Sequence, residues 1–152
     1  MTIPHPLQTS FWLACDAVIW RHCAPWELDE ALVNWGYTMG PCEAQDLAGL
    51  DTVLAGRGDA GSPVLARMVG EGRVGKKGGW GYYRYPGGGG AVIDPLIDDL
   101  VREEAWFAKL DRTELEGEAL VAALHTRLEP LLRTDADVAR LLHLPADRLE
   151  TL

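Results

Sequence analysis

Apolar residues recur at helical spacing in the first quarter of the chain and predict two helices there. Residues 1–9 lack this periodicity and predict an irregular arm. A helix that begins at Ser10 carries apolar side chains on one broad face: Phe11, Trp12, Cys15, Val18 and Ile19. Pro25 ends that helix and suits the first position of a second one, which runs to Trp35 and ends at Gly36.

Prolines and a serine mark the starts of shorter helices in the next segment. Pro41 begins a helix that ends near Gly49, and residues 50–55 add one or two further turns. Ser62, followed by a proline, is a helix N-cap and predicts a short helix over 64–69. The residues that follow are rich in glycine, lysine and aromatic side chains, and Tyr82, Tyr83 and Tyr85 favour an extended segment.

Four consecutive glycines at 87–90 are the sharpest break in composition and predict a flexible linker over 87–93. Beyond it, Asp94 and Pro95 open a helix that reaches Phe107. Thr113 and Glu116 have the spacing of a capping box, which predicts a helix over 115–128. Further helices are expected over 135–142 and from Pro145. The chain is therefore predicted to be all-α with one extended aromatic segment.

This pattern divides the chain into a helical domain over 10–86, the linker over 87–93, and a second helical unit over 94–152. A faint repeat at a separation of 108 residues matches Ala14, Asp29 and Ala31 with Ala122, Asp137 and Ala139. Two helix pairs of similar polarity also produce such matches by chance. The residues alone therefore leave open whether the second unit is a degenerate half-repeat of the first.

Composition narrows the class of protein. The 152 residues are 47% hydrophobic and 24% charged, which is typical of a folded globular chain too short for a complete two-domain enzyme. The formal charge of −9 disfavours binding to nucleic acid, and no apolar stretch approaches the roughly 20 residues of a membrane span. Three cysteines without a CxxC pair indicate reduced thiols, so a cytoplasmic location is expected. The many tryptophans imply a large apolar contact zone, in a core or at a subunit interface.

Common catalytic patterns are missing from the sequence. The four histidines lie far apart without metal-ligand spacing, and neither serine lies in a nucleophile elbow. The glycines at 72–81 follow a predicted helix and lack both phosphate-loop signatures. Glu43, Asp46 and Asp51 lie close in sequence, as an acid–base set or as ordinary helix-start residues. We therefore assign no catalytic, metal-binding or cofactor-binding residue.

A local cationic cluster stands out against the acidic background of the chain. It consists of Arg73, Lys76 and Lys77. These side chains either bind an anionic ligand or balance nearby acidic residues.

Two stretches resemble the C-terminal domain of 3-hydroxyacyl-CoA dehydrogenases. Residues 36–51, GYTMGPCEAQDLAGLD, resemble the family pattern GYPMGPFEL-D--GLD, and residues 72–85, GRVGKKGGWGYYRY, resemble its closing G-KTG-GFY-Y segment. Both occur in the family's order and at its spacing. The resemblance implies an all-α helical bundle of the 6-phosphogluconate dehydrogenase C-terminal type. Because multifunctional proteins of this family carry two copies of the domain, it also implies that residues 94–152 are a shortened, degenerate second copy packed on the first.

The resemblance also implies a place in acyl-CoA metabolism. In that family a preceding Rossmann domain binds NAD and holds the catalytic residues, and the helical domain dimerises and lines the acyl-CoA cleft. This sequence shows no Rossmann motif, and the family's Asn-Arg pair on the first helix is absent, because Asn34 is the chain's only asparagine and lies on the second helix. NAD is therefore expected only from a partner subunit.

The leading hypothesis is a stand-alone helical domain of fatty-acid oxidation. It would form a homodimer through its Trp-rich helices, and bind an acyl-CoA-like ligand or complement a separate Rossmann subunit. Motif positions assign the acyl side to Met39, Gly40 and Pro41, and the CoA phosphates to Lys76 and Lys77. The alternative is a non-catalytic dimerisation or interaction module that has lost ligand binding. A third hypothesis, a dehydrogenase active by itself, has no cofactor domain in this sequence.

Overall fold

The computed structural model describes residues 6–129. The helices predicted over 135–142 and from Pro145 lie outside these residues, as do residues 1–5 of the predicted arm. The described elements, in chain order, are α1 (Pro6–His22), α2 (Pro25–Trp35), α3 (Pro41–Ala48), α4 (Leu50–Arg57), α5 (Val64–Gly70), a 3₁₀ turn (Lys76–Gly78), β1 (Tyr83–Arg84), a second 3₁₀ turn (Pro86–Gly88), β2 (Val92–Ile93), α6 (Pro95–Phe107) and α7 (Glu118–Leu128). This part of the chain confirms the all-α prediction.

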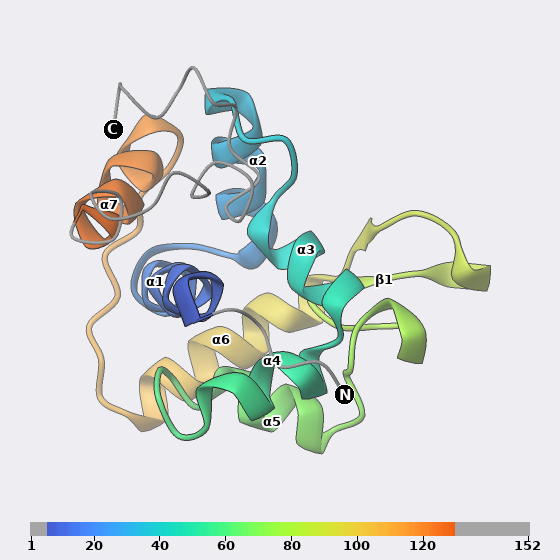
Figure 1. Ribbon diagram of the computed structural model, residues 1–152. Coiled ribbons are helices and arrows are strands. Elements are labelled where there is room, and N and C mark those ends of the chain that lie inside the picture. Colours follow the sequence, from blue (N-terminus) through green and yellow to red (C-terminus); the bar gives the residue numbers. More distant parts are fainter. Residues whose placement is uncertain (1–5, 130–152) are drawn as a thin grey trace.

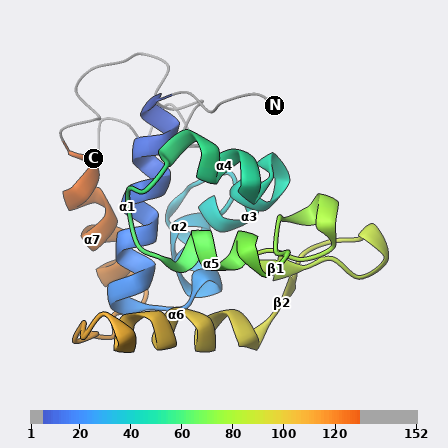
Figure 2. The same cartoon turned by 90° about the horizontal axis from the view of Figure 1, so that it is seen from below.

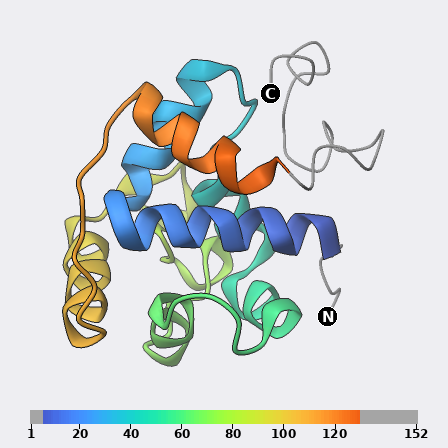
Figure 3. The ribbon, with the colours of Figure 1, turned by 90° about the vertical axis from the view of Figure 1, so that its left-hand side faces the viewer.

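Helix α1 is the central element of the fold. Figure 1 shows it end-on among the other helices, and Figure 3 shows it lengthwise with α2 and α7 on one side and α4 and α5 on the other. It contacts α2, α3, α4, α6 and α7. Apolar side chains such as Phe11, Cys15 and Ile19 are buried on this helix. A helix that is surrounded in this way needs apolar residues over much of its circumference, as α1 has.

Proline and glycine set most of the helix boundaries. Helices α2 and α3 begin at Pro25 and Pro41 as predicted, and the chain leaves α2 at Gly36 with φ of 142°. The start predicted for α1 was wrong, since this helix begins at Pro6 and not at Ser10. A proline at the first helical position costs no hydrogen bond, so Pro6 opens the helix that we expected it to exclude.

The aromatic segment is extended as predicted, and it is paired. Tyr83 in β1 lies opposite Ile93 in β2, in an antiparallel hairpin that projects from the helices in Figure 2. The glycine run predicted as a linker forms the turn of this hairpin, where Gly87 and Gly88 have φ of 63° and 73°. Strand β2 was not predicted, because two residues show no periodicity.

Helix α6 begins as predicted, with the side chain of Asp94 accepting a hydrogen bond from the amide of Leu96 at 3.1 Å. The capping box predicted from Thr113 and Glu116 was wrong, because α7 begins only at Glu118. The amide of Thr113 instead donates to the carbonyl of Arg21 at 3.0 Å. The last carbonyls of α1 need donors, and the segment before α7 supplies them.

Arg112 completes this C-terminal cap of α1. Its guanidinium donates to the carbonyl oxygens of Ile19 and Trp20 at 3.0 Å and of Cys23 at 2.9 Å. The connection between α6 and α7 is thereby fixed to the end of the central helix.

Helices α6 and α7 pack on the first part of the chain. Helix α6 contacts α1 and α5, and α7 contacts α1 and α2. His125 in α7 lies edge-on to Trp35 with ring centroids 4.6 Å apart, and its Nε2 is 3.1 Å from the hydroxyl of Tyr37.

Because residues 130–152 are not described, the predicted domain boundaries at 86 and 94 and the predicted half-repeat stay predictions. None of the described helices has the length and apolar character that crossing a membrane requires.

A substitution at Gly75 tests how closely the glycine-rich segment approaches α3. Its φ is 101°, and a Cβ there would overlap the carbonyl oxygen of Asp46. We expect Gly75→Ala to lower the free energy of unfolding by roughly 2–4 kcal/mol, measured by urea denaturation. The control is Gly70→Ala, where a Cβ meets nothing within 4 Å. Equal stability of the two variants would contradict the close approach.

Candidate functional site

Two buried carboxylates organise the region that the signature motifs build. Asp29 on α2 accepts hydrogen bonds from the amides of Cys42 at 2.8 Å and Glu43 at 3.0 Å, which are the first free amides of α3. The hydroxyl of Tyr83 donates to the same carboxylate at 2.7 Å. Asp29 therefore caps α3 from another helix and fixes strand β1 to the same point.

Asp46, one helical turn further along α3, holds the aromatic segment. Its carboxylate accepts hydrogen bonds from the amides of Tyr82 at 2.9 Å and Tyr83 at 3.0 Å, and from the hydroxyl of Tyr85 at 2.7 Å. The two acids thus connect α2, α3 and β1 into one rigid unit.

The glycines of both signature motifs make room for these acids. A Cβ on Gly40 would overlap the side chain of Asp29, and a Cβ on Gly81 would overlap the carboxylate of Asp46. The residues that carry the family resemblance therefore have structural roles at these positions.

Burial dominates the electrostatics of both acids. Removal from water raises the pKa of Asp29 to about 6, although its three hydrogen bonds oppose this shift. The same cause raises the pKa of Asp46 to about 6. Asp51, by contrast, is partly exposed, and its hydrogen bond from Lys77 lowers its pKa. The sequence left Glu43, Asp46 and Asp51 open as an acid–base set or as helix-start residues. Asp46 is bound to the aromatic segment and Asp51 to Lys77, so these two acids have separate partners.

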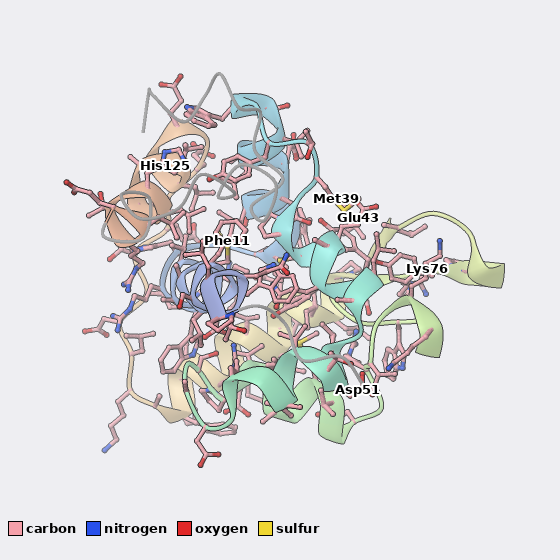
Figure 4. The ribbon with its side chains drawn as sticks, viewed as in Figure 1. Phe11, Met39, Glu43, Asp51, Lys76 and His125 are labelled. Atoms are coloured by element: carbon pink, nitrogen blue, oxygen red, sulfur yellow. The ribbon has the colours of Figure 1, made fainter. Side chains whose placement is uncertain are left out.

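The predicted acyl-side residues lie at the start of α3. Gly40 and Pro41 are buried, and Met39 is partly exposed in the loop that precedes them. Figure 4 places Met39 beside Glu43 at this end of the helix, with Lys76 further out toward the hairpin. Lys77 lies near the other end, where its ammonium is 2.7 Å from the carboxylate of Asp51 at the start of α4. The eight residues of α3, about 12 Å, separate the two groups.

Of the two alternatives for the cluster of Arg73, Lys76 and Lys77, the structure places Arg73 with the second, because this side chain balances a nearby acid. Arg73 is only 3% exposed, because its guanidinium donates to Asp94 at 2.9 Å and stacks 4.0 Å from the ring of Trp80. Lys76 is exposed, with its ammonium 5.9 Å from the ring centroid of Tyr85, and forms no ion pair with a described residue. Of the three cations, Lys76 is the one that an anionic ligand reaches without breaking an ion pair.

A shallow surface pocket of about 280 Å³ opens beside this corner of the fold. Its lining comes from α2, α3 and both strands: Trp26, Asp29, Glu30, Val33, Gly40, Glu43, Tyr83 and Ile93. Of these, only Gly40 was predicted as a site residue. Trp26 and Val33 carried no motif signal, and Ile93 reaches the pocket only because β2 pairs with β1.

Asp29 was also missed as an organising residue, although the sequence holds one signal for it. It is a charged residue on the buried face of α2, next to the fully buried Leu28. A buried acid of this kind implies fixed donors around it. Among residues 6–129, no three His, Cys, Asp or Glu side chains are arranged to hold a metal ion.

The helical fold, together with the unit that Asp29 and Asp46 build from α2, α3 and β1, defines the class of the protein as an all-α domain of the dehydrogenase C-terminal type. The sequence model of the family described as "3-hydroxyacyl-CoA dehydrogenase, C-terminal domain" matches residues 7–85. The chain belongs to this family. The match ends at Tyr85, so β2, α6 and α7 lie beyond it.

Curated relatives agree with this assignment. The chain is 35% identical over 91 residues to a rice (Oryza sativa subsp. japonica) protein named "Peroxisomal fatty acid beta-oxidation multifunctional protein". It is 31% identical over 123 residues to the "Peroxisomal bifunctional enzyme" of Danio rerio. These alignments cover 54% and 66% of this chain, but only 12% and 16% of the two relatives. The chain thus corresponds to a small part of each, and its own cytoplasmic location stays a prediction.

The raised pKa of Asp29 gives a test of the site's electrostatics. A folded pKa of about 6 lies above the ordinary 3.8, so this group stabilises the fold at low pH, and that stability is lost as the pH rises through 6. We expect the stability of wild type relative to Asp29→Asn to rise by about 1.4 kcal/mol between pH 7.5 and pH 5, measured by urea denaturation. Comparison with the isosteric variant cancels the titration of other groups, and a relative stability that falls over this range would contradict the assignment.

Proposed function

We propose that this domain forms one wall of an acyl-CoA site in fatty-acid oxidation, together with an NAD-binding domain supplied by a separate chain. Membership of the family and the β-oxidation name of the rice relative support the metabolic context. The observation that carries the proposal is the pocket beside Gly40. Gly40 belongs to the signature motif at residues 36–51. The ligand's apolar chain would lie there and its phosphates toward Lys76.

The lining of the pocket suits an apolar chain better than a polar ligand. Trp26, Val33 and Ile93 contribute apolar surface, and the pocket is wide open to solvent. A ligand bound only here would keep much of its surface in water, so a second protein surface is needed to enclose it. In this proposal the partner domain supplies that second wall, NAD and the catalytic groups.

The region around the pocket is held rigidly, which favours binding without reorganisation. Tyr83, which lines the pocket, is fixed through its hydroxyl to Asp29 and through its amide to Asp46. A preformed wall loses little conformational entropy when a ligand binds.

A second candidate function is a non-catalytic dimerisation or interaction module. One observation favours it: Gly40, Asp46 and Arg73 make contacts within the domain, and Lys77 is paired with Asp51. Contacts of this kind serve the domain whether or not a ligand binds. Ligand binding is what separates the two candidates.

Calorimetry with acetoacetyl-CoA tests the proposed function. We expect measurable heat for the wild type, and an affinity roughly fivefold lower for Lys76→Ala, because one phosphate contact contributes about 1 kcal/mol. Arg127→Ala is the matched control, since Arg127 is an exposed cation on α7, on the opposite side of the molecule in Figure 1, and should bind like wild type. Absence of heat at millimolar ligand would favour the interaction module.

A further inference from the structure

A groove runs between α2 and the start of α7, across the molecule from the hairpin in Figure 1. It consists of two surface concavities of about 230 Å³ and 250 Å³, which adjoin because Ala31, Asn34 and Gly117 line both. Gly117 and α7 lie beyond the family match, which ends at Tyr85. One side of this α2–α7 groove is therefore not part of the matched domain, and the proposed acyl-CoA site does not use the groove.

The floor of the α2–α7 groove is apolar. Ala31, Leu120 and Val121 line it and are themselves buried in the packing of the two helices. The space beside Gly117 is empty, since a Cβ built at this residue would have no atom within 4 Å. A groove of this shape accepts the apolar side chains of a third helix, which recur every three or four residues.

The walls of the α2–α7 groove are acidic on both sides. Glu27 and Glu30 line it from α2, and Glu116 and Glu118 line it from the start of α7. Glu27 has a local role, because it accepts a hydrogen bond from the amide of Ala24 at 2.8 Å. The other three glutamates form no ion pair with any residue of 6–129, and no basic side chain of these residues lines the groove.

Helix geometry accounts for only part of this charge. Glu118 lies in the first turn of α7, where the helix dipole favours an acid. Glu30 lies across the groove in the middle of α2, where the dipole offers no such advantage. Arg102, which lines the concavity next to the groove, is already paired with Asp98 at 2.8 Å and with Glu114 at 3.0 Å. The described part of the chain therefore leaves the like charges on the two walls uncompensated.

Charge decides which partner fits the α2–α7 groove. Two copies of the chain joined through it would bring their glutamates together around a two-fold axis, and like charges placed in this way cost binding energy. A helix with an apolar stripe flanked by lysine or arginine instead places the stripe on the floor and its cations beside the walls. Such a helix relieves the repulsion between the walls.

We infer that the α2–α7 groove binds an amphipathic helix of another protein, in which basic side chains flank an apolar stripe. Asn34 is exposed and lies where the two concavities meet. The chain's only asparagine, which fills no position of the family motifs, is thus at the centre of the groove. The inference does not depend on the acyl-CoA site of the proposed function.

Calorimetry with a designed peptide tests this inference on the full chain. The probe is a helical peptide of about 16 residues, with leucine recurring every three or four residues, lysine on both flanks of this stripe and alanine elsewhere. We expect it to bind the wild type, with an affinity that falls as salt is added. The same peptide with glutamate in place of lysine should not bind.

Two changes in the groove should weaken binding of the lysine peptide. Glu116→Gln/Glu118→Gln removes two charges and should lower the affinity roughly fivefold, as expected for two exposed ion pairs. Asn34→Trp fills the junction of the concavities and should lower the affinity at least tenfold without changing the charge. Circular dichroism establishes that each variant is folded.

Asp59→Asn/Asp99→Asn is the matched control. It also removes two charges from exposed side chains, which lie in the loop after α4 and on α6, outside the groove. This variant should bind the lysine peptide like wild type.

Four results would overturn the inference. No heat with the lysine peptide at millimolar concentration would show that the groove does not bind such a helix. Equal weakening by the two double variants would show that net charge attracts the peptide, and Asn34→Trp with wild-type affinity would show that the peptide binds elsewhere. In sedimentation velocity, a wild-type oligomer that Asn34→Trp dissociates would make a second copy of the chain the occupant.

Discussion

Two buried carboxylates, those of Asp29 and Asp46, connect the helical part of this domain to its aromatic hairpin. Between them they accept four backbone amides and two tyrosine hydroxyls, from α3 and from the segment 82–85. Their burial is energetically unfavourable, as their raised pKa values indicate. The hydrogen bonds offset that cost only if every donor is held in place. The position of the hairpin, the capping of α3 and the need for glycine, which has no Cβ, at positions 40 and 81 all follow from this requirement.

The same constraint explains why the signature motifs say more about fold than about chemistry. Gly40 and Gly81 are needed because the carboxylates approach the backbone closely. Arg73 is buried in an ion pair with Asp94 and is therefore not accessible to a ligand. These contacts leave a solvent-exposed pocket beside Trp26. The motifs build a rigid unit around the two carboxylates, and side chains outside the motifs, such as Ile93, complete the lining of the pocket beside it.

The segment beyond the family match changes which surfaces are available. Helix α7 covers α2 through His125, and Arg112 caps α1. The pocket beside α3 and the hairpin stays open, and residues of α2, α3 and both strands line it. The charged side chains that line it are acidic, in keeping with the net charge of −9 of the chain.

Sequence alone determined the helices with strong local signals, such as α2 between Pro25 and Gly36, because proline and glycine act on the backbone within a few residues. It also determined the family, since two motifs keep their order and spacing. Tertiary structure alone decided three features. Helix α7 starts late, because the amide of Thr113 donates to the last turn of α1. Arg73 is buried, and the pairing of β2 with β1 brings Ile93 to the pocket that Trp26 also lines. Each of these depends on a partner distant in the sequence. Local propensity holds no information about which distant group will supply a donor, a counter-charge or a neighbouring strand.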